Sequence, residues 1–220
     1  MSSPQMLLVL MLVQQGLLGA LWLGVASLGL ARQPALHWGA ATLVLAASLG
    51  LVALRDAALS PWVGYLLGNT LGIVAYAAMR RGVQHFCGLQ RTDRAQVAAV
   101  ALGTAALAWA IGAGGTPALW VSITSATLAW ILFAAAGDGL RGLRGEFGPV
   151  KAWACMTPLL LAGALFAVRA VLTLSWTDVA GRPASAGGAF DVAVGLTALT
   201  LFLLMHLGLG AMVVLRTVQQ

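Results

Sequence analysis

The sequence predicts an all-α fold, a polytopic membrane helical bundle of about seven transmembrane helices. Apolar residues fill 60% of the 220 positions, whereas charged residues fill only 8%. Soluble domains carry about 25% charged residues, so a soluble globule of this composition could not cover its surface. Long apolar runs recur along the whole chain, which indicates a single integral membrane domain over residues 1–220 and excludes a cytosolic enzyme.

The boundaries of the spans follow from the apolar runs. A hydrocarbon core of about 30 Å takes roughly 20 helical residues. The predicted spans are residues 6–29, 38–54, 62–79, 97–112, 117–136, 152–174 and 189–215. The second and fourth are short, so six full spans with one re-entrant segment is an alternative. The prolines that fall in connections or first turns support these boundaries; they are Pro34, Pro61, Pro117, Pro149 and Pro183.

The first span is predicted to be a retained helix. It starts at Met6 with no Lys or Arg before it, and it is too long for the core of a signal peptide. Its small residues Gly16, Ala20 and Gly24 form a stripe that predicts helix packing.

Basic residues predict an N-out, C-in orientation in the inner (plasma) membrane, because short loops rich in Lys and Arg resist translocation. The inner side then holds nine basic residues, namely Arg32, Arg80, Arg81, Arg91, Arg94, Arg141, Arg144, Lys151 and Arg216. The outer connections hold Arg55 and Arg182. Tryptophans mark both interfaces, with Trp62, Trp109, Trp120 and Trp176 near the outer one and Trp38 and Trp153 near the inner one. The net charge of +6 is therefore explained by basic residues on the inner side of the membrane, and no nucleic-acid partner is expected.

The third span carries polar residues at helical spacing. Tyr65, Asn69 and Tyr76 lie along one helix face. Beside this face runs a ridge of small residues formed by Gly64, Gly68 and Gly72. The ridge lets another helix approach closely, and the polar groups point into the bundle. An interhelical hydrogen-bond clamp is the favoured interpretation, and a ligand pocket is the alternative.

The fourth to sixth spans supply further candidates. Gly112 and Pro117 leave a very tight link, which predicts a helical hairpin of the fourth and fifth spans. Hydroxyl residues of the fifth span can bond to backbone carbonyls of their own helix. Arg169 lies about five residues from the outer end of the sixth span, where it can snorkel. Asp178 or Asp191 could pair with it. The alternative to a snorkelling arginine is a buried ion pair between Arg169 and one of these aspartates, facing a cavity that opens to the outer side.

His206 is the histidine that lies deep in the last span, whereas His37 and His85 fall in inner connections. A hydrogen bond across the bundle is the expected role of His206. A membrane haem usually takes two axial histidines from facing helices, and no second deep histidine is present. We therefore expect no cofactor.

The cysteines and the known catalytic motifs predict neither a metal site nor an enzyme. Cys87 and Cys155 form no CxxC pair, and both fall on the side where thiols stay reduced. The sequence has no Ser-His-Asp set, no HExxH and no Walker loop, the motifs that would point to catalysis.

Two predicted inner connections echo each other at a spacing of 60 residues. Residues 81–88 and 141–148 both begin Arg-Gly-apolar and carry glycine at the eighth position. A duplicated helical hairpin and two independent juxtamembrane turns are both compatible with this echo.

The third span and its continuation also resemble a known family. Asn69-Thr70-Leu71, followed by Arg81-Gly82-Val83-Gln84-His85-Phe86-Cys87-Gly88, and Arg169 in the sixth span resemble the multi-helix N-terminal membrane region of bacterial GGDEF diguanylate cyclase proteins. The resemblance implies a sensory region whose last helix leads into a cytoplasmic catalytic domain. The sequence itself contains no GGDEF motif, so the cyclase would be an output domain in cis or a partner protein.

These observations leave three functional hypotheses. The first is a sensory or signal-relay module that responds to membrane lipid or an unknown small ligand and displaces the C-terminal end. The second is a small-molecule transporter or permease subunit, which the predicted spans disfavour because they contain no broken half-helices and no buried acidic residue. The third is a membrane-embedded enzyme or cytochrome.

Overall fold

The computed structural model describes residues 3–89, 94–175 and 189–219, and the regular structure in these ranges is entirely helical. Within these ranges seven helices are long and apolar enough to cross a membrane, so the chain is a multi-pass membrane protein. This confirms the seven-helix prediction over the six-span alternative. The helices are α1 (Ser3–Ser27), α2 (Arg32–Ala58), α3 (Gly68–Phe86), α4 (Arg94–Gly112), α5 (Pro117–Phe147), α6 (Pro149–Ser175) and α7 (Ala189–Gln219). A π-helical turn, η1 (Trp62–Leu67), leads directly into α3.

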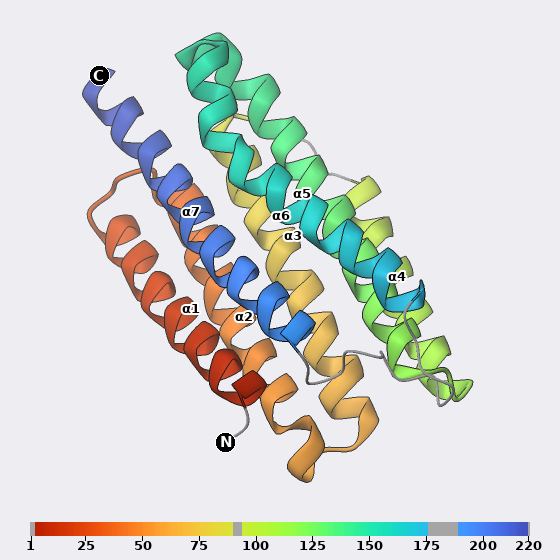
Figure 1. Ribbon diagram of the computed structural model, residues 1–220. Helices are drawn as coiled ribbons and strands as arrows, with labels where there is room; N and C mark the ends of the chain where they lie inside the picture. Colours follow the sequence, from red (N-terminus) through yellow and green to blue (C-terminus); the bar gives the residue numbers. More distant parts are fainter. Residues whose placement is uncertain (1–2, 90–93, 176–188, 220) are drawn as a thin grey trace.

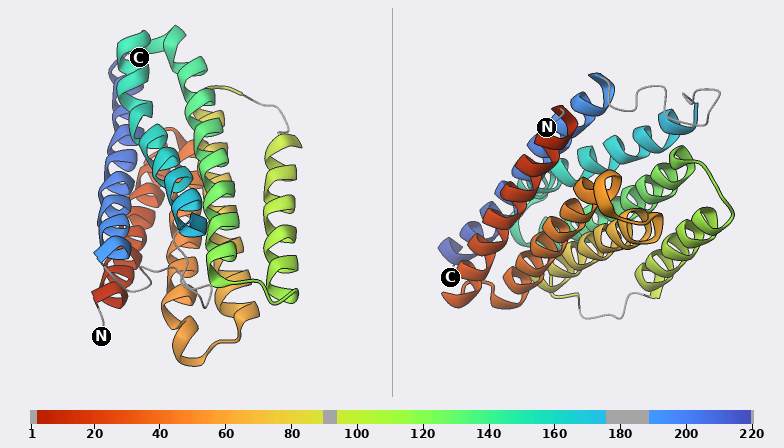
Figure 2. Two further views of the ribbon diagram at one scale, coloured as in Figure 1. Left: turned by 45° about the vertical axis from the view of Figure 1, so that its right-hand side comes forward. Right: turned by 90° about the horizontal axis from the view of Figure 1, so that it is seen from below.

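Six helices pack as a closed ring, in the order α1, α2, α3, α5, α6 and α7, with α7 returning to α1. The termini lie at opposite ends of the bundle (Figure 1). Helix α4 lies outside the ring and packs mainly on α5, with fewer contacts to α3 and η1. It stands visibly apart from the other helices in the left view of Figure 2. The predicted hairpin of α4 and α5 is present, although α5 packs far more extensively on α6.

The end of the bundle that holds the C-terminus, which we call the arginine-rich end, is formed by the last turns of α3, α5 and α7 and the first turns of α2, α4 and α6. Among the described residues it carries Arg32, Arg80, Arg81, Arg94, Arg141, Arg144, Lys151 and Arg216. Arg91 belongs to the same part of the sequence but lies outside the described residues, as do Trp176 and Arg182 of the predicted outer side.

Two helices run well past the ends of the predicted spans, α3 to Phe86 and α5 to Phe147. Charged residues had marked these stretches as connections, but buried apolar residues such as Phe86, Leu143 and Phe147 continue along both helices. Their packing outweighs the low helix propensity of the glycines in residues 137–147. A glycine in the left-handed region ends each helix, with φ 69° at Gly88 and 82° at Gly148. At α3 the N–H of Leu89 donates to the Gln84 carbonyl at 2.8 Å, which is the Schellman arrangement.

The echo at residues 81–88 and 141–148 is therefore a pair of helix C-termini rather than two inner loops. His37 and His85 likewise lie within α2 and α3 instead of connections, and their tilted rings face each other with centroids 4.6 Å apart. Whether the echo records a duplication stays a prediction.

Pro34, Pro117 and Pro149 lie in the first turn of a helix, as predicted, where a missing N–H costs least. Pro158, by contrast, lies inside α6. Pro117 and Pro149 are the first residues of α5 and α6, and Pro34 lies in the first turn of α2. The hydroxyl of Thr116 accepts from the N–H of Leu119 at 3.3 Å, and this bond caps the start of α5. Pro183 lies outside the described residues.

The small-residue ridge of the third span packs against α2. The Ser48 hydroxyl donates to the carbonyl of Gly68 at 2.7 Å. A Cβ added at Gly72 would meet the same hydroxyl at 3.2 Å. In α1 the predicted stripe was misplaced, because a Cβ at Gly16 or Gly24 would meet nothing within 4 Å. The residue of α1 that approaches α2 closely is Gly19.

Trp38 lies in the core rather than at the predicted membrane interface. Its side chain is fully buried, with ring centroids 4.8 Å from Trp22 and 6.0 Å from Phe86. Gly82 of α3 makes room for it, because a Cβ there would lie 2.3 Å from the indole nitrogen. Trp153 is 45% exposed, in agreement with an interfacial position.

We expect Gly208→Ala to destabilise the bundle by about 1–3 kcal/mol, the usual cost of overpacking. A Cβ at Gly208 would lie 2.9 Å from the Cys155 backbone oxygen, so α6 and α7 would have to separate. Unfolding by sodium dodecyl sulfate in mixed micelles measures the change. Gly210→Ala is the matched control, because a Cβ there meets nothing within 4 Å. Equal stabilities of the two variants would contradict this account.

Candidate functional site

A buried charged cluster joins α3 to α5 near the arginine-rich end. The Nε of Arg80 donates to Oδ2 of Asp138 at 2.8 Å, and Nε2 of Gln84 donates to the same oxygen at 2.9 Å. Arg141 binds the other carboxylate oxygen. Arg80 is 6% exposed and Asp138 is 3% exposed, so water screens this pair poorly. The Arg80 guanidinium also lies 5.5 Å from the ring centre of Trp130, within the range of a cation–π contact.

Helical spacing places these groups. Arg80 and Gln84 are four residues apart, so they share one face of α3 and reach one carboxylate. Asp138 and Arg141 are three residues apart on α5. Asp138 was not among the predicted site residues, because the predicted span ended at residue 136. The Asp-x-x-Arg spacing directly after a long apolar run was the signal that could have found it.

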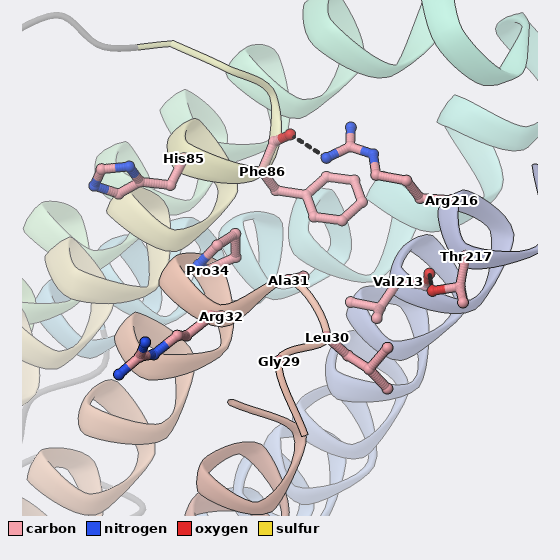
Figure 3. A pocket seen from close by; sticks show the side chains of 10 residues that line it. All are labelled: Gly29, Leu30, Ala31, Arg32, Pro34, His85, Phe86, Val213, Arg216 and Thr217. Carbon is pink, nitrogen blue, oxygen red and sulfur yellow. Dashed lines mark hydrogen bonds between the residues drawn. The ribbon is translucent and has the colours of Figure 1, made fainter. Parts of the chain in front are cut away.

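A second contact, which we call the Arg216 clasp, joins the end of α7 to α5 and α3. Nε of Arg216 donates to Oε1 of Glu146 at 2.6 Å, and a second nitrogen binds the other carboxylate oxygen. Nη1 of Arg216 donates to the carbonyl of Phe86 at 2.7 Å, the bond drawn in Figure 3. The guanidinium lies 3.7 Å from the centre of the Phe86 ring.

The clasp differs from the buried cluster in its exposure to water. The Arg216 and Glu146 side chains are 29% and 33% exposed. Exposed ion pairs contribute about 0–1 kcal/mol, because water screens their attraction. The clasp is therefore the weaker and more easily broken of the two connections.

A pocket of about 370 Å³ lies beside the clasp, between the turn that joins α1 to α2 and the ends of α3 and α7. Figure 3 shows that the Arg32 and His85 side chains lie on the far side and point away from Arg216. The pocket therefore does not gather its cationic groups around one point.

Cys87, at the end of α3, is a partly buried free thiol. Burial raises its pKa to about 11; nearby Arg216 opposes this rise, and the carboxylates of Glu146 and Asp138 add to it. A thiol with such a pKa stays protonated at neutral pH, so Cys87 is neither a nucleophile nor a ready metal ligand.

The predicted residues of the third span lie at separate levels of the bundle. Asn69 donates to the carbonyl of Tyr65 at 2.7 Å, a bond within its own helix instead of the expected clamp between helices. The Tyr65 ring packs on Trp120 of α5, with centroids 4.7 Å apart. Tyr76 is buried between Phe166 and Phe202, and its hydroxyl has no hydrogen-bond partner among the described residues.

His206 makes the predicted hydrogen bond across the bundle. Its Nδ1 accepts from Nε1 of Trp22 at 2.9 Å, which ties α7 to α1. Phe202, which packs on Tyr76, lies one turn before it on α7. Arg169 is half-buried on α6. Its proposed partner Asp178 and the side chain of Asp191 lie outside the described part of the structure.

In the described ranges no group of three or more His, Cys, Asp or Glu residues is arranged to hold a metal ion. Comparisons with protein-family models, with curated proteins and with solved structures found no match.

We expect Asp138→Leu to lower the free energy of unfolding by about 3–5 kcal/mol, because it leaves the buried Arg80 charge without its carboxylate. The double variant Arg80→Met with Asp138→Leu should recover most of this loss, since it removes both charges. Glu146→Gln is the control for an exposed pair and should cost less than about 1 kcal/mol. A double variant as unstable as the single one would contradict the pairing.

We expect Cys87 to be alkylated slowly. In a Cys155→Ser background, the rate with iodoacetamide should rise about tenfold per pH unit between about pH 7 and 10, because the thiolate fraction limits it. The same variant unfolded in detergent should instead level off above about pH 9, near the pKa of an ordinary thiol. A folded-state rate that levels off at the same pH would show that Cys87 is not shielded.

Proposed function

We propose that the protein is a membrane signal-relay module whose output is a displacement of the end of α7. The Arg216 clasp is the observation that carries this proposal. It is the point at which the last helix of the chain contacts α3 and α5 through polar groups. A stimulus that alters the packing of α3 or α5 would therefore change what holds α7.

The buried cluster and the Arg216 clasp support a switch in which the first contact stays fixed and the second can open. The buried cluster resists separation of α3 from α5, whereas the exposed clasp costs only about 1–2 kcal/mol to open when its ion pair and carbonyl bond are combined. That range corresponds to a population shift of about 5- to 30-fold, which is typical of coupling between sites. A ligand or lipid with modest differential affinity could therefore open or close the clasp.

The orientation and the output domain belong to the same proposal. The arginine-rich end would face the cytoplasm of the inner membrane, since basic residues resist translocation. The resemblance to membrane regions that precede GGDEF domains makes a diguanylate cyclase, linked or separate, the proposed output. The end of α7 would then lie on the side that contains GTP.

A cyclase fusion tests the relay. With a diguanylate cyclase domain joined after Gln220, Arg216→Gln and Glu146→Gln should change cyclic di-GMP production about fivefold in the same direction, the ratio expected for loss of about 1 kcal/mol. The double variant should change it no further. Arg144→Gln is the matched control, because Arg144 lies at the same end but stacks on Trp153. Output indistinguishable from this control, at equal membrane levels, would refute the relay.

Transport is the second candidate, and Asp138 is the observation that favours it. The predicted spans contained no buried acidic residue, which argued against ion coupling, but Asp138 is buried within the apolar helix α5. Ionisable groups in such helices commonly mark ion or proton paths. Proteoliposomes loaded with a pH-sensitive dye would separate the candidates. Proton flux above that of empty liposomes, abolished in Asp138→Asn, would favour transport.

A further inference from the structure

A lateral groove of about 720 Å³ lies between α3 and α4, with His37 of α2 at one edge. Its volume falls within the roughly 300–1,000 Å³ typical of ligand sites. Most of its walls are apolar and small. They include Val74 and Ala78 on α3 and Val97, Ala101, Ala105 and Ala108 on α4.

The groove exists because α4 packs closely on α5 but only loosely on α3. Gly103 faces α5 so tightly that an added Cβ would lie 2.6 Å from the Thr127 hydroxyl. Towards α3, Nε2 of Gln96 donates to the carbonyl of Ala77 at 2.8 Å, at the arginine-rich end. Beyond this bond the two helices face each other with short side chains, which leave the space unfilled.

The groove is about one membrane leaflet deep. Gln96 and Ala108, the first and last lining residues on α4, are 12 residues apart, which corresponds to about 18 Å of helix. Half of a hydrocarbon core of about 30 Å is about 15 Å. The depth therefore suits one acyl chain. A second transmembrane helix would need a groove across both leaflets.

The polar lining lies mainly at the arginine-rich end. Arg81 and His37 border the groove there, and among the described residues its lining contains no acidic side chain. The Arg81 guanidinium donates to Oε1 of Gln84 at 3.1 Å, which holds it in place at the mouth. A guanidinium at the level of the lipid headgroups complements a phosphate, with which it forms charge-assisted hydrogen bonds.

We propose that the lateral groove binds one anionic phospholipid, with an acyl chain between α3 and α4 and its phosphate beside Arg81. This site is separate from the Arg216 clasp and does not depend on the relay. Lipid binding would fix the position of α4 against the ring.

Native mass spectrometry of the full chain in detergent, incubated with phosphatidylglycerol or with phosphatidylcholine of the same chains, tests the charge requirement. One phosphatidylglycerol should remain bound, with phosphatidylcholine retained about fivefold less, the factor expected for one basic residue near an anionic lipid. Arg81→Gln should lower phosphatidylglycerol to the phosphatidylcholine level, whereas Arg144→Gln, outside the groove, should not. Equal retention of the two lipids by the unaltered protein would overturn the proposal.

A second pair of variants tests the place of binding. Ala105→Phe fills the groove and should remove the bound lipid, whereas Ala106→Phe, its exposed neighbour outside the groove lining, should leave it in place. If Ala105→Phe does not fold, Ala101→Leu serves in its place. Equal retention in the groove-filling and control variants would overturn the proposal. So would a dimer that the groove-filling variant abolishes, because a second copy would then occupy the groove.

Discussion

The carboxylate of Asp138 sets the geometry of the arginine-rich end. It receives Arg80 and Gln84 from α3 and Arg141 from its own helix, and both of its oxygens are occupied. A buried carboxylate is tolerated only when opposite charge and hydrogen-bond donors surround it. This requirement fixes the register of α3 against α5, and the other contacts at this end are built around that pair of helices.

The Arg216 clasp depends on this register. Glu146 follows Asp138 by about two turns on α5, and the Phe86 carbonyl follows Arg80 by less than two turns on α3. The end of α7 can reach both partners because the buried cluster holds the two helices side by side. The clasp itself is partly exposed and therefore weak. Helix α7 is held along its length by α1 and α6, so the clasp bears only on its last turns.

The sequence predicted the helices better than the residues that connect them. Apolar runs identify spans because lipid offers no partner for an open backbone, so each run must form a helix. The same reasoning ended α5 at residue 136 and excluded Asp138, since a charge seemed to mark a loop. Trp38 was predicted at the interface because tryptophan is enriched at membrane–water interfaces. In the structure it lies in the core, where it packs against Trp22 and Phe86. His206 was predicted correctly in role, but its partner Trp22 could not be inferred, because 184 residues separate them along the chain.

The sequence by itself determined that the chain forms about seven apolar helices with basic residues gathered at one end, because both properties are local and follow from composition along each segment. Only the tertiary structure decided which helices touch. It closed six of them into a ring, left α4 outside beside an open groove, and turned Asp138 towards Arg80 and Arg216 towards Glu146. These contacts depend on complementary shapes and charges of helix faces that are far apart in the sequence. The periodicity within a single helix does not predict which other helix will match it.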